Sequence, residues 1–312
     1  MHKVAGPEEA LVKAYECLFY NPRVPYRVAR AYAALVLRGM RLRRNVAGVE
    51  MDLRVSDILQ ARLLLEGVWE PTLARWWALL SDQSHLTFDV GAHCGFYALY
   101  TAMRNAEARV YAFEPNLKLC DDLSRNIRLN GVGAQVAIDP RAITDRAGSI
   151  TLHLRQYEPA TASVYRPPWE YEATIEVPSV SLDEFRAEQA VGFVDLIKVD
   201  VEGAEGLVLH GMASGLAEEA YQWIVMETHH VLMPENELAL ALRSLSTAGY
   251  TVLRVLESHL EVVGWTENLR PRDQWIISSR RGLARLRGLL GGSLRLPDSY
   301  AGIWRRASFT PR

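Results

Sequence analysis

The stretch LTFDVGAHCG, residues 86–95, decides the fold. Its apolar first half predicts a buried strand, and the glycines that follow predict a tight turn into a helix. The strand would carry Asp89 to its carboxyl end. Gly91 and Gly95 would let the backbone pass close to a ligand at the N-terminus of the helix. This order of strand, turn and helix is typical of the edge of a parallel sheet at which small molecules bind.

Strands keep alternating with helices after this stretch, which predicts a parallel sheet covered by helices on both faces. The pattern predicts seven strands of a mostly parallel sheet, at residues 86–90, 109–113, 135–138, 194–199, 223–227, 250–255 and 274–278. Residues 149–154 and 174–180 alternate like antiparallel strands, so we expect an inserted β-hairpin or lid before the fourth strand. The predicted fold class is therefore α/β and Rossmann-like.

The N-terminal residues follow a different pattern. Residues 1–80 read as a helical cap or arm, with a short edge strand at 49–53 where apolar and charged residues alternate. We expect the sheet to form one catalytic domain over residues 81–280. A basic C-terminal extension would occupy residues 281–312.

Charge is unevenly spread along the 312 residues, which are 49% hydrophobic and carry a net charge of −2. Residues 23–44 hold seven arginines and no acid, and residues 280–312 hold eight arginines and one Asp. The span 45–279 carries 33 acids against 18 Lys and Arg, which disfavours nucleic acid as a substrate. The Arg-rich ends either pack against the acidic core or dock an anionic membrane surface or a partner enzyme.

The cysteines indicate a reducing compartment. Cys17, Cys94 and Cys120 show no metal-binding spacing and leave an odd count, so we predict neither a zinc site nor a disulfide framework. The N-terminus lacks a charged segment followed by a sustained apolar run. Both observations fit a cytoplasmic protein.

A second acidic residue strengthens the prediction of a cofactor crevice. Glu114 ends the strand after the first one, 25 residues beyond Asp89, where a carboxylate can accept hydrogen bonds from both hydroxyls of a ribose. Asp139 and Ala142 follow the third strand, where they could contact the amino group of an adenine. Asp139, however, precedes Pro140 and could equally form a turn.

The charge of the crevice favours one adenosine cofactor. A dinucleotide would want the pattern Gly-x-Gly-x-x-Gly, whose second glycine falls at position 93, where this chain has His, and an acidic turn would repel its pyrophosphate. S-adenosylmethionine presents an ammonium and a sulfonium instead, which the Asp89 carboxylate would attract. We therefore predict S-adenosylmethionine and methyl transfer, with a nicotinamide-dependent oxidoreductase as the alternative.

The ends of the fourth and fifth strands would form the second wall of the crevice. An alcohol acceptor needs a base or a metal ion to lower its pKa, and His229 or His230 is the simplest candidate base. A metal alternative would use Asp200, Glu227 and His229 as ligands for magnesium or manganese. Lys198 would pair with Asp200 or with a neighbouring helix terminus and orient the acidic turn.

Several ordered motifs resemble those of the FkbM-type S-adenosylmethionine-dependent methyltransferases. They are FDVGAHCGFY at 88–97, AFEP at 112–115, LN at 129–130, SLD at 181–183 and IKVDVEGAE at 197–205, and the resemblance spans roughly residues 50 to 255. It implies a class I methyltransferase sheet and transfer of a methyl group to a hydroxyl of a sugar or another natural-product scaffold. His93 departs from the Asn that is frequent in similar turns.

The resemblance completes the set of candidate site residues. It carries over Asp89, Gly91 and Glu114 as cofactor contacts. It also places Lys198, Asp200 and Glu202 in an acidic turn that faces the methyl group. The predicted cofactor-binding set is Asp89, Gly91, Ala92, His93, Gly95, Glu114, Pro115, Asp139, Ala142, Asp200 and Glu202, and the predicted catalytic set is Lys198, Asp200, His229 and His230.

The acceptor itself is predicted only by class, as a small or glycosylated molecule. Aromatic residues of the 155–175 loop, namely Tyr157, Tyr165, Trp169 and Tyr171, could stack on a sugar or ring, or could pack within the lid. A non-catalytic binding module that keeps the cofactor pocket is the third alternative.

Overall fold

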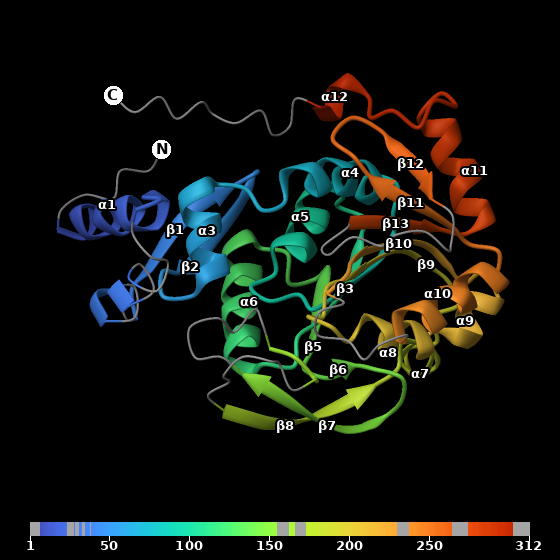
Figure 1. The fold of residues 1–312 in the computed structure, drawn as a ribbon, viewed down its shortest axis with the longest axis horizontal. Helices are drawn as coiled ribbons and strands as arrows, with labels where there is room; N and C mark the ends of the chain where they lie inside the picture. Colours follow the sequence, from blue (N-terminus) through green and yellow to red (C-terminus); the bar gives the residue numbers. More distant parts are fainter. Residues whose placement is uncertain are drawn as a thin grey trace.

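The computed structural model of the chain describes residues 7–23, 28, 31–32, 35–37, 39–154, 162–165, 173–229, 237–263 and 274–301. A central twisted sheet lies between two helical layers, and a small sheet and an N-terminal arm are attached to it (Figure 1). The predicted α/β, Rossmann-like fold is confirmed.

The central sheet has eight strands in the order β12-β11-β13-β10-β9-β3-β4-β5. The strands are β3 (Leu86–Val90), β4 (Arg109–Phe113), β5 (Val136–Asp139), β9 (Val194–Val199), β10 (Tyr221–Glu227), β11 (Thr251–Val255), β12 (Leu260–Val263) and β13 (Gln274–Ser278). From β5 to β10 neighbouring strands are parallel, and β13 runs antiparallel between β10 and β11. All seven predicted strands are present. The eighth, β12, pairs antiparallel with β11 and was not predicted, because four residues with one apolar side chain buried carry little periodic signal.

Side chains of the central strands alternate between two apolar clusters. In β10, Trp223 and Val225 belong to one cluster, whereas Ile224 and Met226 belong to the other. The first cluster is covered by α4 (Pro71–Ser81), α5 (Phe96–Arg104), α6 (Leu117–Asn130) and α11 (Arg280–Leu289). The second is covered by α7 (Leu182–Glu188), α8 (Glu205–His210), α9 (Ala213–Ala217) and α10 (Glu237–Thr247). This burial on both faces explains why the strands read as nearly continuous apolar runs.

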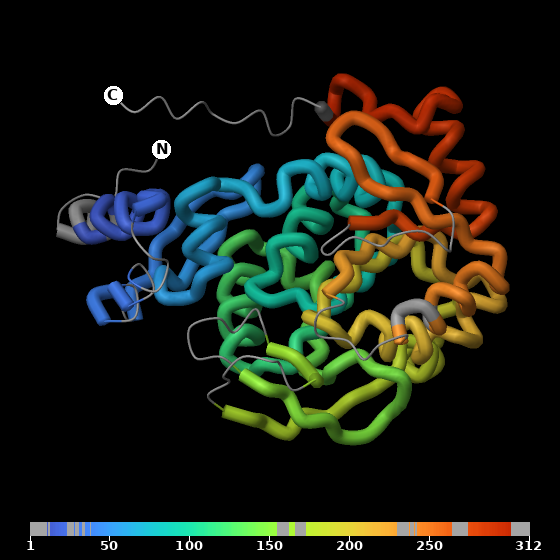
Figure 2. The backbone as a smooth tube through the Cα atoms, viewed as in Figure 1, coloured from blue at the N-terminus to red at the C-terminus, as the bar shows by residue number. Residues whose placement is uncertain are grey.

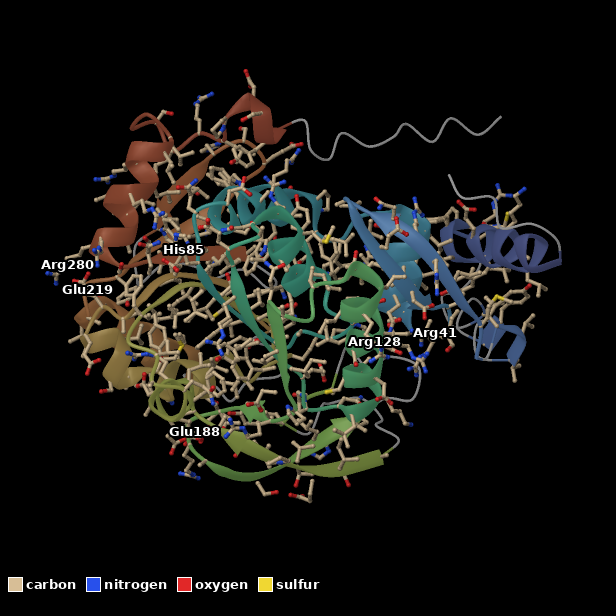
Figure 3. The ribbon with its side chains drawn as sticks, turned by 180° about the vertical axis from the view of Figure 1, so that it is seen from behind. Arg41, His85, Arg128, Glu188, Glu219 and Arg280 are labelled. Carbon is tan, nitrogen blue, oxygen red and sulfur yellow. The ribbon has the colours of Figure 1, made fainter. Side chains whose placement is uncertain are left out.

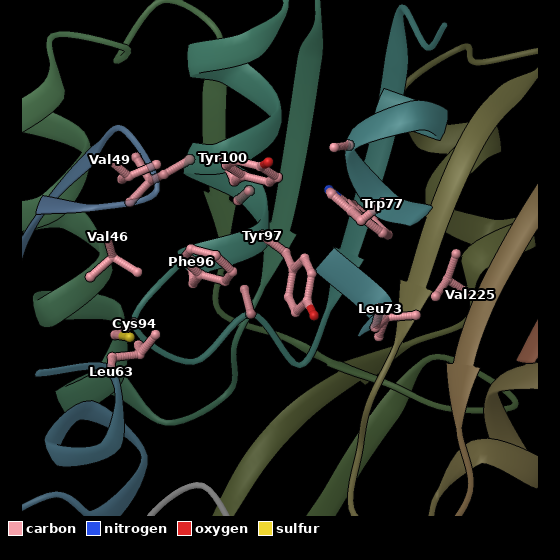
Figure 4. Close-up of a cluster of buried hydrophobic side chains, with 14 of the residues drawn as sticks. Val46, Val49, Leu63, Leu73, Trp77, Cys94, Phe96, Tyr97, Tyr100 and Val225 are labelled. Atoms are coloured by element: carbon pink, nitrogen blue, oxygen red, sulfur yellow. The ribbon is translucent and has the colours of Figure 1, made fainter. Parts of the chain in front are cut away.

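The N-terminal arm combines α1 (Pro7–Tyr20), β1 (Arg41–Val46), β2 (Val49–Arg54) and α3 (Ile58–Glu66), and it projects from one side of the sheet (Figure 2). The predicted strand at 49–53 is present, but it pairs with β1 in a separate two-stranded sheet instead of edging the central one. The sequence did not predict β1 because its RLRRNV run lacks apolar alternation. Figure 4 shows Val46 and Val49 of this hairpin close to Phe96 of α5, with Trp77 of α4 beyond.

Asp122 joins the arm to the sheet core. Its buried carboxylate on α6 accepts hydrogen bonds from Arg41 Nη1 at 2.6 Å, Arg54 Nη2 at 2.9 Å and Gln60 Nε2 at 2.9 Å. These donors come from β1, β2 and α3. Figure 3 shows Arg41 lying toward α6. One acidic residue therefore neutralises much of the positive charge that the hairpin brings to the interface.

The insertion forms a separate three-stranded sheet of β6 (Ala142–Ile143), β7 (Gly148–Leu154) and β8 (Ala173–Val180), in the order β6-β8-β7. The predicted hairpin is confirmed by the antiparallel pairing of β7 with β8. Of the four aromatic residues proposed as an acceptor wall, Tyr157, Trp169 and Tyr171 lie outside the described residues. Tyr165 is described, and its hydroxyl donates to Glu237 Oε2 at 2.5 Å.

Two of the described C-terminal arginines contact the core. Arg280 lies 3.8 Å from Glu219, and Figure 3 shows the two side chains together. Arg285 donates to the carbonyl of Gln83 and stacks over the Trp223 ring at 5.4 Å. These contacts fit packing of this end on the core, and docking of a membrane or partner through the Arg-rich ends stays a prediction. No helix in the described ranges is long and apolar enough to cross a membrane.

Candidate active site

A cavity of about 1130 Å³ opens at the carboxyl ends of β3, β4, β9 and β10, and α1, α3 and the insertion close its other sides. Nine of the predicted site residues line it: Gly91, His93, Glu114, Pro115, Ala142, Asp200, Glu202, Glu227 and His229. Asp89, Ala92 and Lys198 line a smaller neighbouring cavity of about 40 Å³, whose wall also includes Gly91, His93 and Asp200. The structure thus gathers residues from two distant motifs at one crevice.

The turn after β3 packs directly on the turn after β9. Gly91 has φ +84°, and a Cβ added to it would lie 2.0 Å from the carbonyl oxygen of Asp200. The amide of Asp200 in turn donates to the Val90 carbonyl at 3.1 Å. Because only glycine fits this approach, Gly91 is needed to bring the cofactor turn and the acidic turn together.

Glu114 is fixed at the end of β4 by two backbone groups. Its Oε2 accepts from the His93 N–H and its Oε1 from the Asn116 N–H, both at 2.9 Å. Burial raises the pKa of this carboxyl above its usual range, and the two N–H groups oppose that shift. Each oxygen keeps further acceptor capacity, so the carboxylate is positioned to receive ligand hydroxyls from the cavity.

Asp89 has a structural role that can coexist with cofactor binding. Its Oδ2 accepts from the Ala98 N–H at 3.0 Å and so caps the first turn of α5. Its Oδ1 is buried and makes no hydrogen bond within the described part of the chain. Burial raises the pKa of Asp89 to about 6, while Lys198 opposes the shift. A buried acceptor atom without a partner is suited to a cationic donor such as an ammonium group.

His93 acts through both its backbone and its side chain. Its backbone is left-handed at φ 51°, and its Nε2 lies 3.3 Å from the buried carboxylate of Asp57, the N-cap of α3. Although burial alone would lower it, Asp57 raises the pKa of His93 well above its usual value. The imidazolium therefore ties the cofactor turn to the N-terminal arm, a contact with no sequence-local signal.

Two predicted cofactor residues lie off the cavity wall. Asp139 is held by Arg141, with Nη2 2.8 Å from Oδ2, in the local turn that was the alternative interpretation. Gly95 has φ +91° and approaches Leu123, so it shapes the start of α5. Their assignment as cofactor contacts stays a prediction.

The acidic turn after β9 contains a buried ion pair. Lys198 Nζ lies 2.6 Å from Asp200 Oδ2 and 4.9 Å from the centre of the Tyr97 ring. Burial would lower the pKa of Lys198, but Asp200, Glu70 and Asp89 raise it above its usual value. Lys198 therefore remains an ammonium and holds Asp200 in place, as predicted from its position.

His229 faces the carboxylates of this wall. Its Nδ1 lies 2.9 Å from Glu205 Oε1, and its Nε2 lies 3.8 Å from Glu202 Oε2, 3.8 Å from Glu227 Oε1 and 4.0 Å from Asp200 Oδ1. Burial opposes the charge, yet Glu205, Asp200 and Glu202 raise the pKa of His229 to about 10. An imidazolium has no lone pair to accept a proton, so the raised pKa disfavours His229 as the base at neutral pH when no cation is bound. His230 lies outside the described residues.

Some contributors to the site were not predicted from sequence. Glu205 begins α8, and its side chain is fully buried against His229, a contact that its place in the helix does not reveal. Glu70 accepts from the Tyr97 hydroxyl at 2.9 Å and from Gln274, and it lines the cavity with Trp69. Its place before Pro71 was a clue in the sequence, since a residue before proline is restricted, and its backbone is left-handed at φ 45°.

Several known methyltransferases are similar in sequence to this chain. The model of the "Methyltransferase FkbM domain" matches residues 89–264, more than half of the chain. The hexuronic acid methyltransferase AglP of Haloferax volcanii is 26% identical over 213 residues, which cover 64% of this chain and 74% of that protein. The methyltransferase sdnD of Sordaria araneosa is 28% identical over 152 residues, which cover 40% of this chain and 59% of that protein.

A solved structure gives a weaker likeness. Methyltransferase FkbM from Methylobacillus flagellatus is 16% identical with a TM-score of 0.42, over 83% of this chain and 63% of that one. The chain thus spans less than two thirds of two of these relatives. The family match supports S-adenosylmethionine-dependent methyl transfer and favours it over the nicotinamide alternative. On the match over residues 89–264, the chain belongs to the FkbM methyltransferase family.

Proposed function

We propose that this protein transfers the methyl group of S-adenosylmethionine to a hydroxyl of a sugar or another natural-product scaffold. The observation that carries the proposal is the meeting of the Gly91 turn, the Glu114 carboxylate and the acidic turn at one cavity. When bound, the cofactor supplies a methyl group activated by a sulfonium. The remaining chemistry falls to residues of the cavity.

The residues present fit this cofactor. Glu114 would accept hydrogen bonds from the ribose hydroxyls, and the left-handed Gly91 leaves the turn open to close approach. The Oδ1 of Asp89, which has no partner among the described residues, would accept from the ammonium. The acids of the wall would favour the positive sulfonium over a neutral or anionic ligand.

The N-terminal arm supports a carbohydrate acceptor. Phe19, Tyr20 and Trp69 line the cavity, and Arg62 lies over the Trp69 ring at 5.0 Å. Aromatic faces stack on the apolar faces of sugars, and an arginine would pair with an acidic sugar. The relative AglP is named for hexuronic acid, which agrees with such an acceptor.

The test is turnover with S-adenosylmethionine and an oligosaccharide that ends in a hexuronic acid. We expect S-adenosylhomocysteine and a product heavier by one methylene group that resists mild alkali, because an ether survives conditions that cleave a methyl ester. A Trp69→Ala variant should raise KM for the sugar and leave cofactor affinity unchanged. Absence of turnover across uronic acid, neutral sugar and polyketide acceptors would favour the non-catalytic binding module instead.

A further inference from the structure

We propose that Asp200, Glu227 and His229 form a binding site for one divalent cation, which would hold the oxygen of the acceptor hydroxyl. Cation binding itself stands on the geometry alone. The role toward the acceptor rests on the proposed function. Each of the three residues offers one donor atom, and these atoms lie within 4.8 Å of one another.

The sheet topology brings these three residues together. Strands β9 and β10 are parallel neighbours, and their register pairs Val199 with Met226. Asp200 and Glu227 each come one residue later, so they leave adjacent strands at the same level. His229 follows two residues after Glu227. The carboxyl edge of a parallel sheet is where open α/β proteins place ligands.

The orientation of His229 is independent support for a ligand at this point. Its Nδ1 is held at 2.9 Å by Glu205, whose side chain is fully buried and also accepts from the Gly203 N–H. A carboxylate behind a histidine is the usual arrangement for a metal ligand, because it fixes the tautomer and the ring. The other nitrogen, Nε2, is thereby aimed at the cavity.

The distances around Nε2 suit an ion better than direct hydrogen bonds. Carboxylate oxygens of Glu202, Glu227 and Asp200 lie 3.8 to 4.0 Å from it, which is too long for a hydrogen bond. Two ligands of one cation, each at about 2.0 to 2.2 Å, stand no more than about 4.4 Å apart. An ion placed between these atoms would therefore reach them with small side-chain movements.

The charge of the wall also calls for a cation. Asp200, Glu202, Glu205 and Glu227 face one another around His229, and Lys198 forms an ion pair with Asp200. Their side chains are at most 23% exposed, so water screens this repulsion weakly. A dication would offset it. Two carboxylates and one imidazole suit manganese or magnesium and leave about three positions of an octahedron for other oxygens.

The open positions explain how the cation would serve the reaction. An acceptor hydroxyl bound there has its pKa lowered, and its O–H bond breaks as the proton passes to the Glu202 carboxylate. The oxygen forms a bond to the methyl carbon while the carbon–sulfur bond breaks, which leaves a neutral thioether. His229 must release its Nε2 proton to solvent when the cation binds, and it is then a ligand that positions the cation and not the base.

The binding test uses Mn²⁺ as the probe. The full chain is stripped with a chelator and titrated with MnCl2, and free Mn²⁺ is measured by electron paramagnetic resonance. We expect one saturable site per chain. Glu227→Gln and His229→Gln should each weaken it at least about tenfold, and Glu205→Gln by about tenfold through loss of the support behind the ring.

A matched control is the exposed pair of His85 and Glu107, whose Nδ1 and Oε2 lie 3.9 Å apart. Among the described residues this pair has no third donor that would complete a metal site. Glu107→Gln should leave Mn²⁺ affinity unchanged. Absence of saturable binding, or equal affinity in wild type, Glu227→Gln and His229→Gln, would overturn the site. Circular dichroism identifies a variant that fails to fold, in which case the other variant decides.

Calorimetry with S-adenosylmethionine separates this proposal from the proposed function. Cofactor binding and full turnover by the stripped enzyme would overturn the role of the cation and leave the methyltransferase standing. Mn²⁺ binding that depends on Glu227 and His229, without any cofactor binding, would overturn the proposed methyltransferase and leave the cation site standing. Turnover that requires Mn²⁺ and falls in Glu227→Gln supports both.

Discussion

The missing side chain of Gly91 makes room for the backbone of Asp200. A Cβ on Gly91 would stand 2.0 Å from the Asp200 carbonyl oxygen, so the turns after β3 and β9 touch through backbone atoms. This contact places the cofactor turn beside the acidic turn. Every role proposed for the cavity depends on that placement.

Gly91→Ala should therefore cost both stability and cofactor affinity. We expect a loss of about 2 to 4 kcal/mol in the free energy of unfolding, from the clash and the left-handed backbone together. Gly131→Ala is the matched control, since Gly131 has φ +68° but no atom within 4 Å of an added Cβ, and it should cost about 1 kcal/mol. Urea denaturation measures both. Equal losses of unfolding free energy in the two variants would show that the turns after β3 and β9 are not in close backbone contact.

Asp89 should make stability depend on pH. Burial raises its pKa to about 6 from 3.8, so the folded state takes up a proton more readily than the unfolded chain. Relative to Asp89→Asn, the wild type should gain stability as pH falls from about 6 to about 4, by up to about 3 kcal/mol. The same variant should bind S-adenosylmethionine more weakly at pH 7.5. A difference between the two proteins that stays constant with pH would count against a buried, ionisable Asp89.

The ion pair of Lys198 and Asp200 should be coupled energetically. Lys198→Met leaves Asp200 and its acidic neighbours without their ammonium, and we expect a cost of about 3 kcal/mol in chelator-treated protein. Lys198→Met combined with Asp200→Asn should recover part of that loss. Arg280→Met, which removes the exposed partner of Glu219, should change stability by less than about 0.5 kcal/mol. Additive losses in the double variant would refute the coupling.

Asp122 should control how firmly the arm is attached. Asp122→Ala removes the shared acceptor of Arg41, Arg54 and Gln60, and we expect a loss of about 3 kcal/mol with faster proteolysis of the N-terminal segment. Asp121→Ala changes the exposed neighbour on the same helix and should be nearly neutral. Similar cleavage rates for the two variants would mean that other contacts hold the arm.

Local patterns were sufficient to predict the elements that build the crevice. The apolar run before Asp89, the glycines at 91 and 95 and the acidic end of β9 each carry their signal in consecutive residues. The parallel order of strands then followed from their alternation with helices. The hairpin of the insertion was predicted in the same way, from residues that alternate over each strand.

Contacts between distant elements could not be predicted. β1 pairs with β2, and its Arg41 is bound by Asp122 of α6, two contacts that the composition of β1 does not reveal. The support of His229 by Glu205 joins residues 24 apart in sequence, and that of His93 by Asp57 joins two elements. Tertiary charge pairing decides these contacts: the local sequence is enough to place Glu205 at the start of α8, but it shows nothing of the contact with His229.

The most direct test of the account is calorimetric titration of the purified chain with S-adenosylmethionine, alongside Glu114→Ala and a parallel titration with NADH. We predict saturable binding of one S-adenosylmethionine per chain, at least about tenfold weaker binding by Glu114→Ala because the ribose acceptors are lost, and no binding of NADH. Binding of NADH with no response to S-adenosylmethionine, or unchanged affinity in Glu114→Ala, would contradict the assignment of this cavity.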